Sequence, residues 1–322
     1  MNKKLNNRLI DTVLSNVPKN VKPVSLLSNL LDMSRESAYR RIRGDIPFTV
    51  EEIADLSLEM GFSIDGIVGL GDRERVFFDF SVKSDDSDIT FISMLQRLER
   101  LYQSIGQANH CESILALNSL SPTFFLHFNH LFKFIYFKWL QQDSSISSDI
   151  LFSEIKVPEE INNLRKKISN NMKVVSNRII ILDPNIFLNL IHDIVYFNQR
   201  KLINNEDMVS IKAEISELID IFEKMAKSGI MYNTNVSLYI SSLSINTSTV
   251  YVNINDSEMM TILLMLVANP IFINNLRVCE VHKKTLLSVK RQSTLITQSN
   301  EILQIEFFDR QREYLKNIFP NS

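Results

Sequence analysis

Apolar residues in the first 70 positions recur three and four apart, which is the period of an amphipathic helix. Prolines and glycines break this pattern into short segments. The first predicted helix covers residues 6–17, and Pro23 is well placed to start a second one with a leucine-rich buried stripe. Two further helices follow, and a short fifth one is predicted over residues 63–67. The region therefore has the pattern of five short helices.

The third and fourth of these helices carry clear signals at their ends. Ser34 is a good N-cap, because its hydroxyl can accept from a free backbone N–H one turn on, and Gly44 suits the position after a helix end. Thr49 and Glu52 have the spacing of a capping box at the start of the fourth helix. The third helix, over residues 34–43, is basic, although the region as a whole carries nine basic and nine acidic residues. Positive charge is therefore concentrated on one helix.

An apolar helix, a turn at Asp32-Met33 and this basic helix together have the layout of a helix-turn-helix, whose second helix enters the DNA major groove. Arginine can bond guanine O6 and N7 with two parallel hydrogen bonds, and polar side chains nearby can hold phosphates. The candidate DNA-binding residues are Ser34, Arg35, Glu36, Ser37, Tyr39, Arg40, Arg41 and Arg43. The alternative is a solvated basic helix in an ordinary bundle.

The residues Ser-Arg-Glu-Ser-Ala-Tyr-Arg-Arg-Ile-Arg-Gly, followed by Ile-Pro-Phe-Thr-Val-Glu-Glu-Ile, resemble those of the Cro/repressor-type helix-turn-helix. The resemblance is closest to its BetR-type branch of bacterial transcription regulators. It covers about the first 70 residues, roughly a fifth of the chain. It implies a five-helix DNA-binding domain in which the helix from Ser34 reads the DNA.

The chain departs from the general pattern of this motif at three positions. Asp32 stands where glycine is commoner, Arg41 where an apolar residue is usual, and Ile42 where a polar residue is usual. An alternative core face runs through Ala38, Tyr39 and Ile42. The sequence alone thus leaves open whether Arg40 or Arg41 faces DNA.

The rest of the chain has a mixed pattern in which helices dominate. Strands are predicted at 114–117, 178–182, 236–244 and 249–254, the last two forming a hairpin around 246–248. Helices are predicted at 89–105, 121–142, 158–172, 185–201 and 206–228, and most of the chain from 256 onward is predicted to be helical, including 301–319. The fold class is mainly α: a helix-turn-helix domain (1–70), a linker (71–88) and a larger helix-rich α+β domain of unknown type (89–322).

Two helices of the larger domain each allow two interpretations. The helix over 89–105 has heptad spacing for just over two heptads, which fits a core-facing helix or a dimer seam. The helix over 122–140 is apolar on almost every side, so that it is a central core helix, or it lines an apolar ligand pocket or a subunit interface. In the ligand interpretation the polar anchors are His127, His130 and Lys133.

Composition narrows the function further. The net charge is -2, so DNA attraction has to come from a local patch. The two cysteines form no disulfide framework, and neither a signal peptide nor an apolar run long enough for a membrane is evident, so we expect a cytoplasmic protein. His127 with His130, and Cys279 with His282, have ligand-like spacing but lack partner pairs, so no metal and no cofactor are expected.

The sequence therefore predicts a bacterial one-component transcription regulator that is not an enzyme, because no catalytic group pattern is evident. Its expected partners are double-stranded DNA, a second copy of the chain in a homodimer, and an unidentified small-molecule or protein effector. The rival interpretation is a protein-interaction or scaffold protein that reuses a helix-turn-helix without touching DNA.

Overall fold

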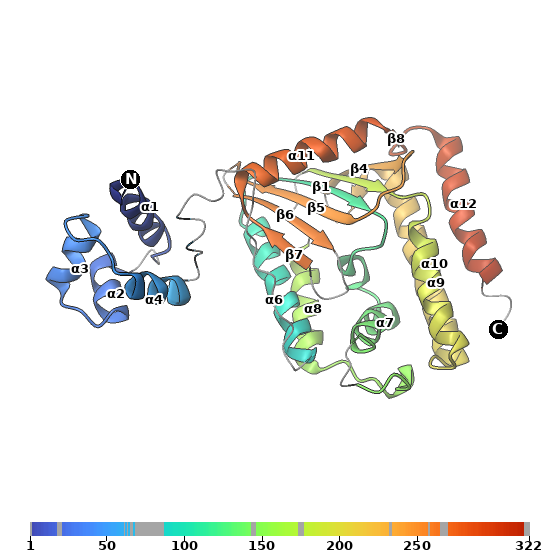
Figure 1. Ribbon diagram of the computed structural model, residues 1–322. Coiled ribbons are helices and arrows are strands. Elements are labelled where there is room, and N and C mark those ends of the chain that lie inside the picture. Colours follow the sequence, from blue (N-terminus) through green and yellow to red (C-terminus); the bar gives the residue numbers. More distant parts are fainter. Residues whose placement is uncertain are drawn as a thin grey trace. The chain divides into compact units, whose positions relative to one another are not determined.

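The computed structural model describes residues 2–17, 21–60, 62, 64, 67, 87–142, 146–172, 177–231, 234–256, 258–264 and 270–318. Contacts within the chain divide it into two compact units, residues 1–78 and 79–322, each of which is described by itself (Figure 1). The predicted helix over 63–67 and the predicted linker over 71–88 lie almost wholly outside the described residues.

The first unit is made of short helices, four of which are described: α1 (Asn2–Ser15), α2 (Pro23–Leu30), α3 (Arg35–Ile42) and α4 (Val50–Met60). Pro23 stands in the first turn of α2, where its missing N–H is not needed. The unit has a core of its own, formed by Leu9, Ile10, Val13, Leu27, Ala38, Phe48, Leu56 and Ile67. The four predicted helices that fall on described residues are thereby confirmed.

The second unit is built on a mixed sheet with the strand order β3-β4-β2-β1-β5-β6-β7, and β8 pairs with β4. Strands β1, β2 and β4 run parallel, whereas the other pairs are antiparallel. The bounds are β1 (Cys111–Leu117), β2 (Asn177–Leu182), β3 (Ile230–Met231), β4 (Thr234–Ser241), β5 (Ser248–Ile254), β6 (Glu258–Leu264), β7 (Pro270–Ile273) and β8 (Ser293–Leu295).

Helices cover both faces of this sheet. They are α6 (Ser87–Gly106), η2 (Pro122–Phe125), α7 (Asn129–Leu140), η3 (Phe152–Glu154), α8 (Glu159–Asn171), α9 (Ile186–Gln199), α10 (Asn205–Ser228), α11 (Leu276–Arg291) and α12 (Glu301–Ile318). Alternate residues of β1 face opposite sides: Leu115 belongs to the large core with α6 to α10, and Ile114 to a smaller cluster with residues of α11. Helix α11 lies on the opposite side of the sheet from α6 and α8 (Figure 1). Helix α12 packs on α9 and α10.

The predicted helix-rich unit with strands is confirmed, but the arrangement of its strands is not the predicted one. Strands β4 and β5 were expected to form a hairpin, whereas β4 pairs with β2, and β5 pairs with β1. The expectation was wrong because two buried parallel strands lie between them. The expectation of mostly helix after residue 256 was also wrong over β6, β7 and β8. The apolar run in β6 is short, and periodicity cannot separate a short buried strand from a helix.

Two helix predictions from the larger unit can be judged in the same way. Helix α6 buries Phe91, Leu95, Tyr102 and Ile105 in its own unit, so the core-facing interpretation of its heptad spacing is confirmed. The helix predicted over 121–142 is broken into η2 and α7. Two thirds of the residues of α7 are buried, which confirms it as a core helix.

Candidate nucleic-acid interface

Local chemistry at both ends determines the length of α3. Ser34 is the N-cap, and its Oγ accepts a hydrogen bond from the Ser37 N–H at 3.2 Å. At the other end Gly44 has a φ of +76°, its N–H donates to the Arg41 carbonyl at 3.0 Å, and the Asp45 N–H donates to the Arg40 carbonyl at 2.9 Å. This pair of bonds is a Schellman motif, which needs a left-handed residue. The predicted caps are thus confirmed.

The backbone of the turn between α2 and α3 shows why glycine is commoner than aspartate at position 32. This residue has a φ of +44°, a left-handed conformation that glycine adopts without strain. Two hydrogen bonds hold the turn: the Met33 N–H donates to the Ser28 carbonyl at 3.1 Å, and the Ser28 hydroxyl donates to the Met33 carbonyl at 2.5 Å. Asp32 therefore occupies a position where glycine would be the less strained residue.

The inner face of α3 contains Ala38, which is fully buried, and Ile42, which packs against the same core. Tyr39 is 51% exposed and does not belong to this face, so the alternative core face was wrong at that position. Arg41 also turns inward. Its side chain is 14% exposed and forms two hydrogen bonds with the Glu52 carboxylate on α4, at 2.8 and 2.6 Å.

The ion pair between Arg41 and Glu52 links α3 to the start of α4. Glu52 also accepts from the Thr49 N–H at 3.0 Å, and its own N–H donates to Thr49 Oγ1 at 3.2 Å, which is the predicted capping box. Burial would raise the pKa of the Glu52 carboxyl, but the hydrogen bond from Arg41, the Thr49 N–H and the charge of Arg41 hold it below its ordinary value. Arg41 is therefore a structural residue, and its guanidinium is not available to a partner outside the unit.

The outer face of α3 carries the other candidates. Arg35, Glu36, Tyr39, Arg40 and Arg43 are all exposed. Neither Arg35 nor Arg40 forms an ion pair or a side-chain hydrogen bond with another described residue. The Arg43 guanidinium lies 5.6 Å from the centre of the Tyr39 ring and forms an exposed ion pair with Asp45 at 3.6 Å. Of the two arginines that the sequence could not separate, Arg40 is exposed and Arg41 is paired inside the unit.

The two serines at the start of α3 are already engaged in the cap. The Ser34 hydroxyl is also within 3.0 Å of Ser37 Oγ, and Ser37 is half-buried. Arg35 and Glu36, which stand beside them, are both exposed. The strongest candidate contacts are therefore Arg35, Arg40 and Arg43, all of which extend guanidinium donors into solvent.

The three predicted pocket anchors, two on α7 and His127 in the turn before it, are not brought together. The His130 ring bonds Glu214 at 3.0 Å, the Lys133 ammonium lies 4.3 Å from the centre of the Phe152 ring, and His127 is within 3.1 Å of Ser169 Oγ. One cavity that borders α7 is lined by Ile135 and Lys138 rather than by these three residues, and a second hollow is lined by His127 but by neither of the other two. The assignment of His127, His130 and Lys133 as anchors of one pocket was therefore wrong.

The residues with ligand-like spacing have other partners. Within the described ranges, no group of three or more His, Cys, Asp and Glu side chains is placed to hold a metal ion. The His282 ring lies between Thr249 Oγ1 at 2.9 Å and Thr261 Oγ1 at 3.0 Å, and the Cys279 thiol donates to the Ile273 carbonyl at 3.4 Å. Burial lowers the pKa of His282, which favours its neutral ring.

Comparison with known proteins agrees with the resemblance of the N-terminal region. Residues 11–77 match the model of the BetR domain, and this range includes α2, α3, α4 and the C-terminal end of α1 from Asp11 to Ser15. The match covers about a fifth of the chain and makes the first unit similar to the BetR domain. The comparisons with curated proteins and with solved structures found no match. Among the described helices none has the length and apolar composition needed to cross a membrane.

Proposed function

We propose that this protein is a transcription regulator that binds double-stranded DNA in a sequence-specific manner through the outer face of α3. The observation that carries the proposal is the set of exposed arginines on this short, capped helix, of which Arg35 and Arg40 have no partner among the described residues. Guanidinium groups that are free of internal ion pairs are available to base edges and phosphates. The match to the BetR domain supports the same assignment.

Each arginine has a different role in this proposal. Arg35 stands in the first turn of α3, the end of a recognition helix that contacts base edges, so it reads sequence. Arg40 and Arg43 lie near the other end and hold phosphates, which positions the helix without reading sequence. Arg41 anchors α3 to α4 through Glu52 and touches no DNA. Glu36 disfavours phosphate and can accept a hydrogen bond from cytosine N4.

The second unit supplies the remaining functions in this proposal. A single helix-turn-helix makes few contacts, and such proteins usually bind as two-fold dimers at half-sites about 10 base pairs apart. We therefore propose a cytoplasmic, non-enzymatic homodimer whose second unit dimerises, senses an effector, or does both. An effector would act by changing the spacing or orientation of the two α3 helices, which couples the two sites in free energy.

The test is an electrophoretic shift on a duplex enriched from a random pool with the full-length protein, titrated with salt. DNA binding predicts tight retardation that weakens steeply as salt rises, because bound arginines release counterions. Arg35→Ala should abolish the preference for the enriched sequence. The matched control is Arg277→Ala, which removes the same charge from an exposed position of the second unit and should change nothing.

The rival scaffold function gives a different result in the same experiment. A protein that reuses the helix-turn-helix for protein contacts enriches no sequence. Any retardation it shows is weak and responds equally to Arg35→Ala and Arg277→Ala. That result would exclude sequence-specific DNA binding.

A further inference from the structure

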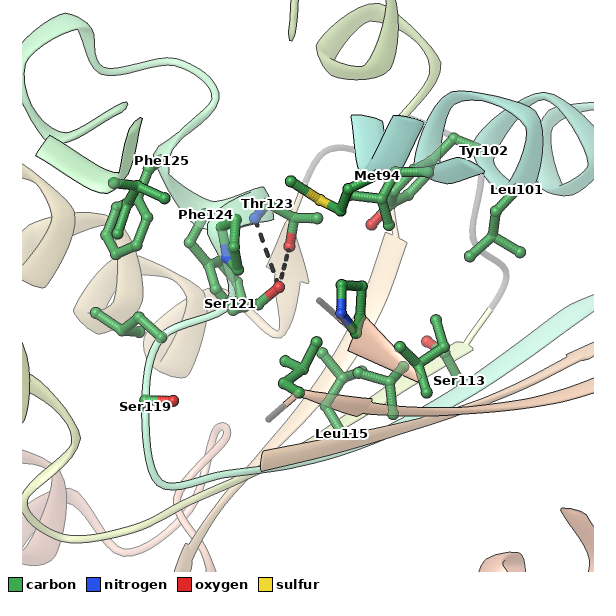
Figure 2. Close-up of a pocket in the computed structure, with 18 of the residues that line it drawn as sticks. Met94, Leu101, Tyr102, Ser113, Leu115, Ser119, Ser121, Thr123, Phe124 and Phe125 are labelled. Carbon is green, nitrogen blue, oxygen red and sulfur yellow. Dashed lines mark hydrogen bonds between the residues drawn. The ribbon is translucent and has the colours of Figure 1, made fainter. Parts of the chain in front are cut away.

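A cavity of about 290 Å³ lies in the second unit between the sheet and helices α6, α7 and α9. Figure 2 shows Met94, Leu101 and Tyr102 of α6 on one side of it and Ser113 and Leu115 of β1 on the other. Most of the lining residues are apolar, including Phe124 and Phe125. The volume is at the small end of the range of ~300–1,000 Å³ that is usual for small-molecule sites. It corresponds to roughly ten non-hydrogen atoms, at the ~30 Å³ that one water takes up in the liquid.

One charged side chain is buried at this cavity. Arg178 of β2 is 6% exposed, lines the cavity, and stands opposite Ser113 in the register of the parallel pair β1–β2. Its Nε donates to Ser113 Oγ at 3.4 Å, and this is the only hydrogen bond of its side chain within the described parts of the chain. Arginine has five N–H donors and keeps its charge inside proteins. Its terminal N–H groups therefore have no acceptor among the residues that the structure describes.

Within the described ranges, no ionisable group forms an ion pair with Arg178. Glu112, the residue before Ser113, is paired with Lys283 at 2.6 Å. The Cys111 thiol is close enough for Arg178 to affect it, but burial raises the pKa of Cys111 to about 11, so that the thiol carries no charge near pH 7. Asp193, which also lines the cavity, forms an ion pair with Lys138. A buried guanidinium without a counter-ion is costly, because its lost hydration is not replaced.

We infer that this cavity binds a small organic monoanion with an apolar body and a carboxylate head, and that Arg178 is the residue that holds the carboxylate. The planar guanidinium matches a carboxylate with two parallel hydrogen bonds. Because Lys138 is already paired with Asp193, Arg178 offers one unbalanced positive charge, which suits one carboxylate better than a doubly charged phosphate. The alternating residues Leu115, Val250 and Val252 of the same sheet face line the wall along which the apolar body lies.

One side of the cavity is lined by polar residues. Ser119, Asn189 and Gln142 are exposed there and line the cavity, so ligand and water can enter on that side. The Ser121 hydroxyl accepts from the Thr123 N–H at 3.5 Å and from the Thr123 hydroxyl at 3.0 Å, and it is thereby committed to the start of η2 (Figure 2). The residues that determine the ligand class are therefore Arg178 and the apolar residues of the cavity walls.

Calorimetric titration of the full-length protein tests this inference. The probes are hexanoate, octanoate and 3-phenylpropanoate, and octan-1-ol is the uncharged control. We expect saturable binding of at least one carboxylate at millimolar or lower concentration, with octanoate bound at least tenfold tighter than octan-1-ol. Arg178→Met should weaken octanoate binding at least tenfold and leave octan-1-ol binding unchanged, whereas the exposed Arg277→Met should leave both unchanged.

A second variant keeps the inference testable should Arg178→Met fail to fold. Val250→Phe places a ring in the cavity and should abolish binding of both octanoate and octan-1-ol by a protein with unchanged circular dichroism. The inference is overturned if no carboxylate binds the wild type, if Arg178→Met binds octanoate as the wild type does, or if folded Val250→Phe retains binding. These titrations contain no DNA, so their outcome is separate from that of the proposed function. Only the control of DNA binding by this ligand rests on that proposal.

Discussion

Replacing Arg41 with alanine should destabilise the first unit without removing a DNA contact. The two hydrogen bonds between Arg41 and Glu52 are 2.8 and 2.6 Å long, and the side chains are 14% and 18% exposed. Exposed ion pairs contribute about 0.2–1 kcal/mol, whereas removing one partner of a buried pair costs about 3–5 kcal/mol. This pair lies between the two cases, so we expect a loss of about 2 kcal/mol.

Hydrogen exchange followed by mass spectrometry measures this effect in the full-length protein, because peptides from α2 to α4 report on the first unit alone. A loss of about 2 kcal/mol makes their protected amides exchange about 30-fold faster. Arg40→Ala is the matched control, since Arg40 lies on the same helix but is exposed and unpaired, and its exchange should stay within about threefold of wild type. Equal exchange in Arg41→Ala and Arg40→Ala would refute the structural role of Arg41.

Exchange of the same amides also reports how the stabilisation by the Arg41–Glu52 ion pair depends on pH. The pKa of Glu52 is lowered in the folded protein from its ordinary value of 4.5. A lowered pKa means that the stabilisation is complete above pH 4.5 and is lost as the pH falls through the folded value. Protection of α3 and α4 should therefore fall in this acidic range in the wild type. The fall should be smaller in Glu52→Gln, which has no carboxyl to protonate.

Three further predictions concern single positions. Asp32→Gly relieves a left-handed φ and should stabilise the first unit by about 1 kcal/mol, seen as slower exchange of α2 and α3. Because burial raises the pKa of Cys111 to about 11, its alkylation by iodoacetamide at pH 8 should be at least about 100-fold slower than in the unfolded chain. Glu214 accepts the N–H groups of the first three residues of α7, so Glu214→Ala should cost about 2 kcal/mol in urea unfolding followed by the fluorescence of the single Trp139.

Local signals made the first unit predictable. A cap depends on a few neighbouring residues, and Ser34, Gly44 and the pair Thr49 and Glu52 each carry that information within one turn of helix. The caps of α3 and the capping box of α4 were therefore predicted at the residues where they occur. The orientation of Arg41 was not predictable in this way, because it depends on where α4 crosses α3.

The sheet of the second unit shows why pairing is harder to predict than strand formation. The strands around 114–117 and 178–182 were predicted from apolar and β-branched runs, and both are present as β1 and β2. Which strands pair depends on contacts between distant residues, such as Leu115 with Val250. Nothing in the loop between β4 and β5 indicates that two strands separate them. The predicted hairpin failed for this reason.

The cavity residues illustrate the same limit. The polar stripe of α7 was visible in the sequence, but its contacts with Glu214 and Phe152 depend on how the helix is rotated in the core. Arg178 was missed, although a lone arginine in the run Asn-Arg-Ile-Ile-Ile-Leu is a signal. A charged residue is rarely buried without a reason. Its position opposite Ser113 at the cavity becomes evident only once β1 and β2 are paired.

The central claim is that the outer face of α3 is the surface that meets DNA. The salt dependence of affinity for the enriched duplex tests it most directly, measured by fluorescence anisotropy for wild type, Arg40→Ala and Arg277→Ala. If Arg40 neutralises one phosphate, its loss should reduce the slope of log affinity against log salt by about 0.9, and Arg277→Ala should leave the slope unchanged. Identical slopes for all three proteins would contradict the claim.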